Sequence, residues 1–192
     1  MSSWIMYEHM KIIGLCGSAS PKSSTKKLIE AALESAMKKG ADVEFINIAK
    51  LDINGCIGCR ECKKDQVIFC SQNDDMTGLY TKLNEADVIL LGSPIYFGDI
   101  SGQSKCFIDR TYAFFGPEGS KLKKGKKVAA IITQGYADEA HYLRAAELLT
   151  QGFGGCGAKI LSPEFFGGLY NADEITDAQL SRAHALGEKL TE

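Results

Sequence analysis

Short apolar runs alternate with helix-like segments along the whole chain, and this alternation constrains the fold more than any other feature. The run at residues 87–94 is apolar at consecutive positions, which indicates a strand buried on both faces. Strands that alternate with helices pair in parallel, and the helices cover both sides of the sheet. We therefore expect an α/β sandwich of three layers around a five-stranded parallel sheet. The expected strands are residues 11–17, 42–48, 87–94, 126–134 and 158–166, and the expected helices are residues 25–38, 76–85, 103–115, 138–154 and 176–190.

The length and charge of the chain set the broad class of protein. Its 192 residues suit one domain, which we expect at residues 11–192 after an N-terminal extension at 1–10. The formal net charge of -2 offers no electrostatic case for binding nucleic acid or an anionic membrane. The first residues lack the basic and apolar regions of a signal peptide, and no apolar stretch approaches the ~18 residues of a membrane span. We therefore expect a cytoplasmic protein.

A hydroxyl-rich loop, residues 17–25, follows the first expected strand and opens the first expected helix. A helix N-terminus offers free backbone N–H groups and a positive dipole to a phosphate. Neither the GxGxxG fingerprint nor a Walker loop is present, so the loop suits a monoester phosphate such as that of FMN. An ordinary Ser/Thr-rich turn with a helix cap is the alternative. The candidate phosphate-binding residues are Ser18, Ser20, Lys22, Ser23, Ser24 and Thr25.

Two further loops should reach the same edge, because ligands of an open parallel sheet bind beyond the carboxyl ends of its strands. The loop after the third strand is rich in aromatic residues and glycine, and so is the loop after the fourth. Aromatic rings could wall a flat ring system, although each alone could equally be a core or rim residue. The candidate residues are Pro94, Ile95, Tyr96, Phe97 and Gly98 in the first loop, and Thr133, Gly135 and Tyr136 in the second.

Residues 49–75 form a long connection with little regular pattern, and four of the seven cysteines lie in it. The spacing is Cys56-x2-Cys59-x2-Cys62-x7-Cys70, which can direct four thiolates at one [4Fe–4S] cluster. Zinc, redox-active thiols and plain structural cysteines are the alternatives, although structural zinc usually takes two separated ligand pairs. We expect the other three cysteines, at positions 16, 106 and 156, to be inert core residues.

Two charged segments complete the pattern. The lysines at 121, 123, 124, 126 and 127 precede the fourth expected strand. We expect them to form a solvated turn, or else a docking patch for an acidic ferredoxin or nicotinamide phosphates. Asp74 and Asp75 precede the second expected helix and are expected to cap it.

Taken together, the chain resembles the flavodoxin-like NAD(P)H-dependent FMN reductases and, within them, the iron–sulfur flavoproteins of archaea and anaerobic bacteria. The resemblance covers about residues 11–190. One departure is that many relatives have Arg where this chain has Ser20, so that Lys22 is the nearest cation. The motifs that carry the resemblance are Gly17-Ser18-x-Ser20 with Ser23-Ser24-Thr25, the four spaced cysteines followed by Asp74-Asp75-Met76, Ala86-Asp87, Ser93 through Gly98, and Lys105 with Phe107 through Arg110.

The resemblance implies a flavodoxin-like sheet of strand order 2-1-3-4-5, with the cysteine-rich loop inserted after the second strand. It implies an FMN whose phosphate lies at residues 18–25 and whose ring lies against 94–98 and 133–136. It also implies a homodimer or homotetramer.

We therefore expect an oxidoreductase that passes electrons between FMN, a [4Fe–4S] cluster and NAD(P)H or a reduced carrier such as ferredoxin. The cofactors would carry the chemistry, so no side chain is named as catalytic. One alternative is a cluster-free NAD(P)H-dependent FMN or quinone reductase. Another is a non-enzymatic module that binds zinc or senses oxidants through its thiols.

Overall fold

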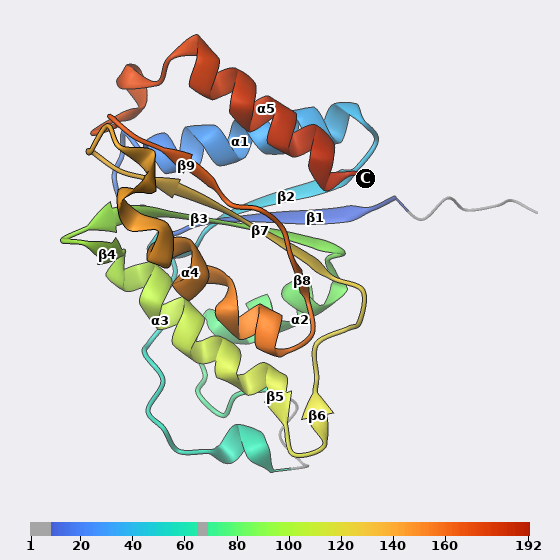
Figure 1. Cartoon of the computed structure of the whole chain (residues 1–192). Helices are drawn as coiled ribbons and strands as arrows, with labels where there is room; N and C mark the ends of the chain where they lie inside the picture. The colour runs from blue at the N-terminus through green and yellow to red at the C-terminus, as the bar shows by residue number, and fades with distance from the viewer. Residues whose placement is uncertain (1–8, 65–68) are drawn as a thin grey trace, which may run out of the picture.

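A computed structural model describes residues 9–64 and 69–192, and Figure 1 shows one parallel sheet between two layers of helices. The strand order is β2-β1-β3-β7, with β8 and β9 both paired to the far side of β7. This confirms the expected flavodoxin-like order, since β7 is the fourth long strand and β8 with β9 make the fifth. The bounds are β1 Lys11–Cys16, β2 Asp42–Asn47, β3 Val88–Tyr96, β7 Lys127–Thr133, β8 Lys159–Ile160 and β9 Glu164–Phe166.

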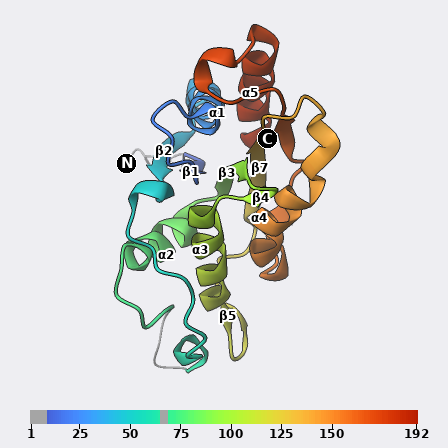
Figure 2. The same cartoon turned by 90° about the vertical axis from the view of Figure 1, so that its left-hand side faces the viewer.

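Among the described residues, five α-helices cover the sheet, and they divide between its two faces (Figures 1 and 2). One layer holds α1 and α5, which approach so closely that a Cβ on Gly187 would meet the Ala32 carbonyl oxygen at 1.9 Å. The other layer holds α2, α3 and α4. No helix in the described part of the chain is both long and apolar enough to span a bilayer. The bounds are α1 Ser24–Lys38, α2 Met76–Glu85, α3 Gly102–Arg110, α4 Leu143–Gly155 and α5 Asp177–Leu190.

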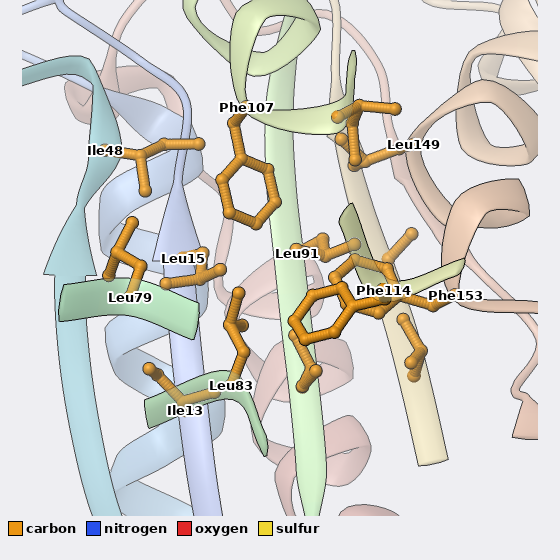
Figure 3. Close-up of a cluster of buried hydrophobic side chains, with 14 of the residues drawn as sticks. Ile13, Leu15, Ile48, Leu79, Leu83, Leu91, Phe107, Phe114, Leu149 and Phe153 are labelled. Atoms are coloured by element: carbon orange, nitrogen blue, oxygen red, sulfur yellow. The ribbon is translucent and has the colours of Figure 1, made fainter. Parts of the chain in front are cut away.

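The larger apolar core lies between the sheet and the layer of α2, α3 and α4 (Figure 3). Strand residues such as Leu15 and Leu91 meet Leu83 of α2 and Phe107 of α3 there, and all four are almost fully buried. A second cluster of buried residues packs α1 and α5 against the opposite face of the sheet. Because both faces are covered, the central strands are buried at nearly every position, as the consecutive apolar pattern indicated.

The last expected strand is not continuous. It divides into β8 and β9, with Pro163 between them, because proline has no N–H to donate to the ladder. Two small elements were not expected from the sequence: β4, Asp99–Ile100, pairs back onto the end of β3, and β5, Phe115–Gly116, forms a hairpin with β6, Gly119–Ser120. The expected extension at residues 1–10 lies outside the described residues except for its last two positions.

The expectation of a solvated basic turn is wrong for Lys126. Its side chain is buried, and its ammonium donates to the carbonyl oxygens of Asn84, at 2.8 Å, and Ala86. These carbonyls lie at the C-terminal end of α2, where the helix dipole is negative and carbonyl groups lack partners within the helix. Burial lowers the pKa of Lys126 to about 8. Lys126 therefore caps α2 and joins it to the start of β7.

Replacement of Lys126 with Met should reduce the free energy of unfolding by about 1–3 kcal/mol, because buried carbonyls lose their donor. Urea denaturation at neutral pH would measure the loss. Lys124→Met, in the exposed turn two residues earlier, should stay within about 0.5 kcal/mol of wild type. Equal stability of the two variants would contradict the capping role.

Candidate functional site

The hydroxyl-rich loop and the two aromatic loops meet at the carboxyl edge of the sheet, as the sequence predicted. They enclose a cavity of about 200 Å³. Tyr96 lies at its rim, half exposed, whereas Ser18, Thr25 and Thr133 are buried. The lining comprises Ser18, Ser20, Lys22, Ser23, Ser24, Thr25, Pro94, Ile95, Tyr96, Thr133, Gln134, Gly135, Leu169 and Tyr170.

Hydroxyl groups in this loop have two different local roles. Ser23 is the N-cap of α1, and its Oγ accepts from the Lys26 N–H at 3.0 Å, so the helix-cap interpretation is correct for that residue. Thr25 instead points across to β7, where its Oγ1 lies 2.6 Å from Oγ1 of Thr133. The ammonium of Lys22 is exposed and pairs with Asp173 at 3.1 Å. The part of the cavity wall that comes from this loop therefore presents neutral hydroxyls at the positive end of a helix, with the Lys22 ammonium beside them.

A buried network of serines holds the first loop against the loop after β3. The Ser101 hydroxyl donates to the Gly17 carbonyl oxygen at 2.6 Å and lies 2.9 Å from the hydroxyl of Ser104, which in turn donates to Ser93. All three serines are fully buried. Gly17 is required here, because a Cβ at that position would lie 1.8 Å from the Ser104 Oγ. The network fixes the spacing between the two loops.

A second cavity, of about 470 Å³, adjoins the first and has mostly aromatic walls. Phe97 is fully exposed at its rim and has φ 51°, and Gly98 beside it has φ 90°. Two successive positive φ values make the tight turn between β3 and β4, and a bulky residue in this region is strained, which is common at functional sites. The lining comprises Ile95, Phe97, Gly98, Gln134, Gly135, Tyr136, Tyr142 and Tyr170.

Arg182 of α5 holds together the two segments that carry Tyr136 and Tyr170 in the wall of the second cavity. Its guanidinium bonds both carboxylate oxygens of Glu139, at 2.9 and 3.0 Å, and also reaches Glu164 and the Phe165 carbonyl oxygen. Glu139 lies in the connection between β7 and α4, and the other two lie in β9. One side chain thus joins the two segments that carry Tyr136 and Tyr170.

Sequence reasoning missed Leu169 and Tyr170 of the first cavity, and it did not single out Gln134 within the predicted loop at residues 133–136. The Gln134 Nε2 donates to the carbonyl oxygens of Tyr136 and Asp138, but its buried Oε1 has no partner among the described residues. Gln134 stands between two predicted residues, and the loop after the fifth strand had to reach the same edge. The rule used for the other loops could therefore have found all three.

The cysteine-rich loop leaves β2 and returns at α2, on the far side of α3 from these cavities (Figures 1 and 2). The two ends of the loop, residues 52–54 and 74–75, form its neck and are joined by backbone and carboxylate contacts. The Asp75 N–H donates to the Asp52 carbonyl oxygen at 3.1 Å, and the Asn54 N–H donates to Asp74 Oδ2 at 3.1 Å. Capping of α2 by both aspartates was therefore only partly correct. Asp74 does accept from the Met76 N–H, but the Asp75 carboxylate accepts from the Asp52 N–H instead.

A buried ion pair lies directly behind this neck. Arg110, at the end of α3, donates through Nη1 to Asp74 Oδ2 at 2.5 Å and to the Asn54 carbonyl oxygen at 2.8 Å, and through Nη2 to Asp74 Oδ1 at 3.0 Å. Both side chains are at most 2% exposed. Burial is the largest single influence and would raise the pKa of Asp74. The hydrogen bonds from Arg110, those from the Asn54 and Met76 N–H groups and the charge of Arg110 together outweigh it and hold that pKa below its ordinary value. Arg110 therefore ties together residues that precede the first cysteine of the motif and follow the last.

The segment around Cys62 and Lys63, which we call the tip of the loop, is held by two lysines. Lys63 donates to the Tyr112 carbonyl oxygen at 2.9 Å and to that of Phe115, and its ammonium lies 3.5 Å from the centre of the Tyr112 ring. Lys121, from the segment after β6, donates to the Cys62 carbonyl oxygen at 2.9 Å. The basic residues near the cysteines thus anchor the loop to the β5–β6 hairpin.

The four cysteines differ in exposure but lie in one neighbourhood. Cys56 and Cys59 are exposed, Cys70 is half-buried and Cys62 is buried. Burial raises the pKa of the Cys62 thiol, and the nearby thiols of Cys70 and Cys56 add to that effect. Cys59 Sγ lies 3.7 Å from the hydroxyl of Ser71, the residue after Cys70. Within residues 9–64 and 69–192, no three His, Cys, Asp or Glu side chains are close enough together to hold a metal ion.

The donor set is nevertheless that of a four-cysteine cluster, carried on one loop with a closed neck. Of the three remaining cysteines, Cys16 and Cys156 are buried, as expected. Cys106 is only half-buried, and it lines a small cavity beside Ile48 and Leu51.

Replacement of Asp74 with Asn should lower the free energy of unfolding at pH 7 by about 3–5 kcal/mol, because Arg110 would remain buried without its anion. The pKa of Asp74 is lowered in the folded state, so its contribution is complete above the unfolded value of about 3.9 and is lost as pH falls toward the folded value. Denaturation of wild type should therefore show a loss of stability below about pH 4 that is smaller in the variant.

The matched control is Glu34→Gln, which removes an exposed ion pair with Lys38 on α1. It should leave the free energy of unfolding close to that of wild type, because exposed ion pairs contribute little to stability. The buried pair is not a major source of stability if Asp74→Asn behaves in the same way.

Comparisons with known proteins agree with this geometry. The family model described as NADPH-dependent FMN reductase matches residues 10–171. An iron–sulfur flavoprotein of Methanocaldococcus jannaschii is 42% identical over 102 residues, 53% of this chain, and the match spans about half (52%) of that relative's length. An iron–sulfur flavoprotein of Archaeoglobus fulgidus is 30% identical over 183 residues, which cover 95% of this chain and 80% of that relative.

Among solved structures, an NAD(P)H:quinone oxidoreductase from Methanothermobacter marburgensis superposes with a TM-score of 0.77 at 19% identity, covering 96% of this chain and 98% of that one. Oxidised flavodoxin 1 from Bacillus cereus superposes with a TM-score of 0.63 at 15% identity, covering 94% and 96%. At these identities the likeness shows the fold. The chain therefore belongs to the NADPH-dependent FMN reductase family of flavin-dependent oxidoreductases and, within it, to the iron–sulfur flavoprotein branch.

Proposed function

We propose that this protein binds FMN in the paired cavities and a [4Fe–4S] cluster on the cysteine-rich loop, and that it transfers electrons between them. NAD(P)H or a reduced carrier such as ferredoxin would be the donor. The observation that carries the proposal is the separation of two distinct donor sets in one fold: neutral hydroxyls at a helix N-terminus, and four thiols on a loop of their own. We also propose that the protein works in the cytoplasm as a homodimer or homotetramer.

The first cavity suits the phosphate end of FMN. The N-terminus of α1 offers unpaired backbone N–H groups and a positive dipole, and the side chains of Ser18, Ser20 and Thr25 add hydroxyl donors. The exposed Lys22 ammonium at the rim adds positive charge, although Asp173 partly offsets it. These groups can hold a dianionic phosphate.

The second cavity suits the flavin ring system. The aromatic side chains of Phe97, Tyr136 and Tyr170 surround it, and the buried Oε1 of Gln134 is an acceptor with no partner in the described residues. An N–H group of a flat heterocycle would supply that partner. Bound FMN would supply hydride and single-electron chemistry, while the protein binds and orients it.

The loop carrying Cys56, Cys59, Cys62 and Cys70 would hold the cluster. Four thiolates are the usual ligands of a [4Fe–4S] centre, and the cluster would supply one-electron transfer. Its neck and tip are fixed by Arg110, Lys63 and Lys121, which hold the cysteine-bearing segments on one loop against α3 and the β5–β6 hairpin. That support favours a resident cluster over incidental cysteines.

A cluster-free NAD(P)H-dependent FMN or quinone reductase is the second candidate. One observation favours it: the described side chains do not bring three thiols within ligating distance of one point. Anaerobic purification followed by assays of iron, sulfide and FMN on one sample separates the two. About four irons per chain supports the cluster, whereas stoichiometric FMN without iron supports the simple reductase.

Thr25→Val tests the phosphate site. Loss of one hydroxyl that can bond a charged phosphate should raise the Kd for FMN about ten- to a hundredfold, measured by quenching of flavin fluorescence. Ser35→Ala is the control, because Ser35 lies three turns further along α1, where its Oγ is 2.9 Å from His184 Nδ1. An unchanged Kd for Thr25→Val would exclude Thr25 from the binding site.

Cys59→Ala tests the cluster. The variant should lose most of its iron and sulfide yet retain FMN, because Cys59 is exposed and lies away from both cavities. Cys106→Ala on α3 is the matched control and should retain wild-type iron. Wild-type iron content in Cys59→Ala would show that the ligand assignment is wrong.

A further inference from the structure

Arg110 has more hydrogen-bonding capacity than its ion pair uses. Its two terminal nitrogens bond Asp74 and the Asn54 carbonyl oxygen, but Nε is buried and has no partner among the described residues. An unsatisfied buried donor is destabilising and usually indicates a missing partner. Two buried side-chain atoms of the described residues lack a hydrogen-bond partner, Arg110 Nε and Gln134 Oε1. Gln134 lines the proposed flavin cavity.

Among the proposed ligand residues, Cys70 belongs to the segment that packs against the end of α3. The Tyr80 hydroxyl donates to the Arg110 carbonyl oxygen at 2.9 Å, and its ring stacks on Phe69, with centroids 5.0 Å apart. Phe69 is the residue before Cys70, so this stack holds the Cys70 segment against the end of α3.

We propose that Arg110 acts on the iron site directly, with its Nε–H held for the sulfur of Cys70 while the rest of the guanidinium closes the neck of the loop. This inference rests on the proposed cluster. A cluster with four thiolate ligands is an anion in a partly buried place, and its reduction adds another negative charge. A fixed cation and a hydrogen bond to a ligand sulfur both favour the reduced form, and they raise the reduction potential.

Arg110→Lys is the most informative variant, because it keeps the charge but has no planar fork that can reach three groups at once. The full-length protein would be reconstituted anaerobically with ferrous iron and sulfide. Cluster potential would be measured by a redox titration followed by electron paramagnetic resonance, and flavin potential by visible absorption. We expect a more negative cluster potential and severalfold faster iron loss to a chelator, while the flavin potential stays at the wild-type value.

A second variant keeps the test valid if Arg110→Lys does not fold. The double substitution Asp74→Leu with Arg110→Met removes both charges together, and such replacements of buried pairs are often tolerated. It should show the same direction of change. Lys105→Met is the control, since Lys105 lies one turn earlier on α3 and is exposed, bonded to Asp109. Its cluster should match wild type.

The outcomes separate the two proposals. If wild type takes up no iron under these conditions, both the proposed cluster and the role of Arg110 are wrong. If wild type takes up about four irons, and both Arg110 variants keep its cluster potential and its rate of iron loss, only the role of Arg110 is wrong. A change in flavin potential as large as that of the cluster would also overturn it, because the effect would then be general to the fold.

Discussion

The buried ion pair between Asp74 and Arg110 is the interaction on which the cysteine-rich loop depends. A loop of this length has a large conformational entropy, and its ends must be brought together before its four cysteines can converge. Arg110 does this from a rigid position at the end of α3, by bonding the Asn54 carbonyl oxygen and both oxygens of Asp74. Since both charged groups are inaccessible to water, neither can be lost without leaving the other uncompensated.

The two cavities at the carboxyl edge of the sheet are supported in a different way. Their walls come from loops that separate strands place at one edge, and short contacts join these loops in pairs. The hydroxyls of Ser93, Ser101 and Ser104 join the loop after β1 to the loop after β3. Arg182 joins the connection after β7 to β9. These contacts use groups that the ligand would not occupy. The cavity can therefore keep its shape while Gln134 Oε1 stays available for a bound partner.

The sequence predicted most of the fold because the pattern was local and repeated. Alternation of apolar runs with helical segments requires only short-range periodicity, and the right-handed crossover rule then limits the topology. The candidate residues at the carboxyl edge followed from the same topology, and the structure places all fourteen in the lining of two adjoining cavities. The break at Pro163 was visible as a weak point, but β4 and the β5–β6 hairpin are too short to produce a period.

Long-range pairing of charges was beyond the sequence. Lys126 belonged to a run of lysines that looked solvated, yet it is buried because α2 ends where β7 begins. Asp74 looked like a helix cap, and its main partner lies 36 positions away. Such partners cannot be identified from spacing, since any of the basic residues could in principle meet any acid.

By itself, the sequence determined the layered α/β fold, the edge at which its loops converge and the chemical nature of the two donor sets. Those properties depend on periodicity and residue type, which are carried by neighbouring positions. Only the tertiary structure decided which buried side-chain atoms of the described residues were left without a hydrogen-bond partner, namely Arg110 Nε and Gln134 Oε1. The physical reason is that satisfaction of a buried polar group is a property of all the atoms packed around it, and these come from distant parts of the chain.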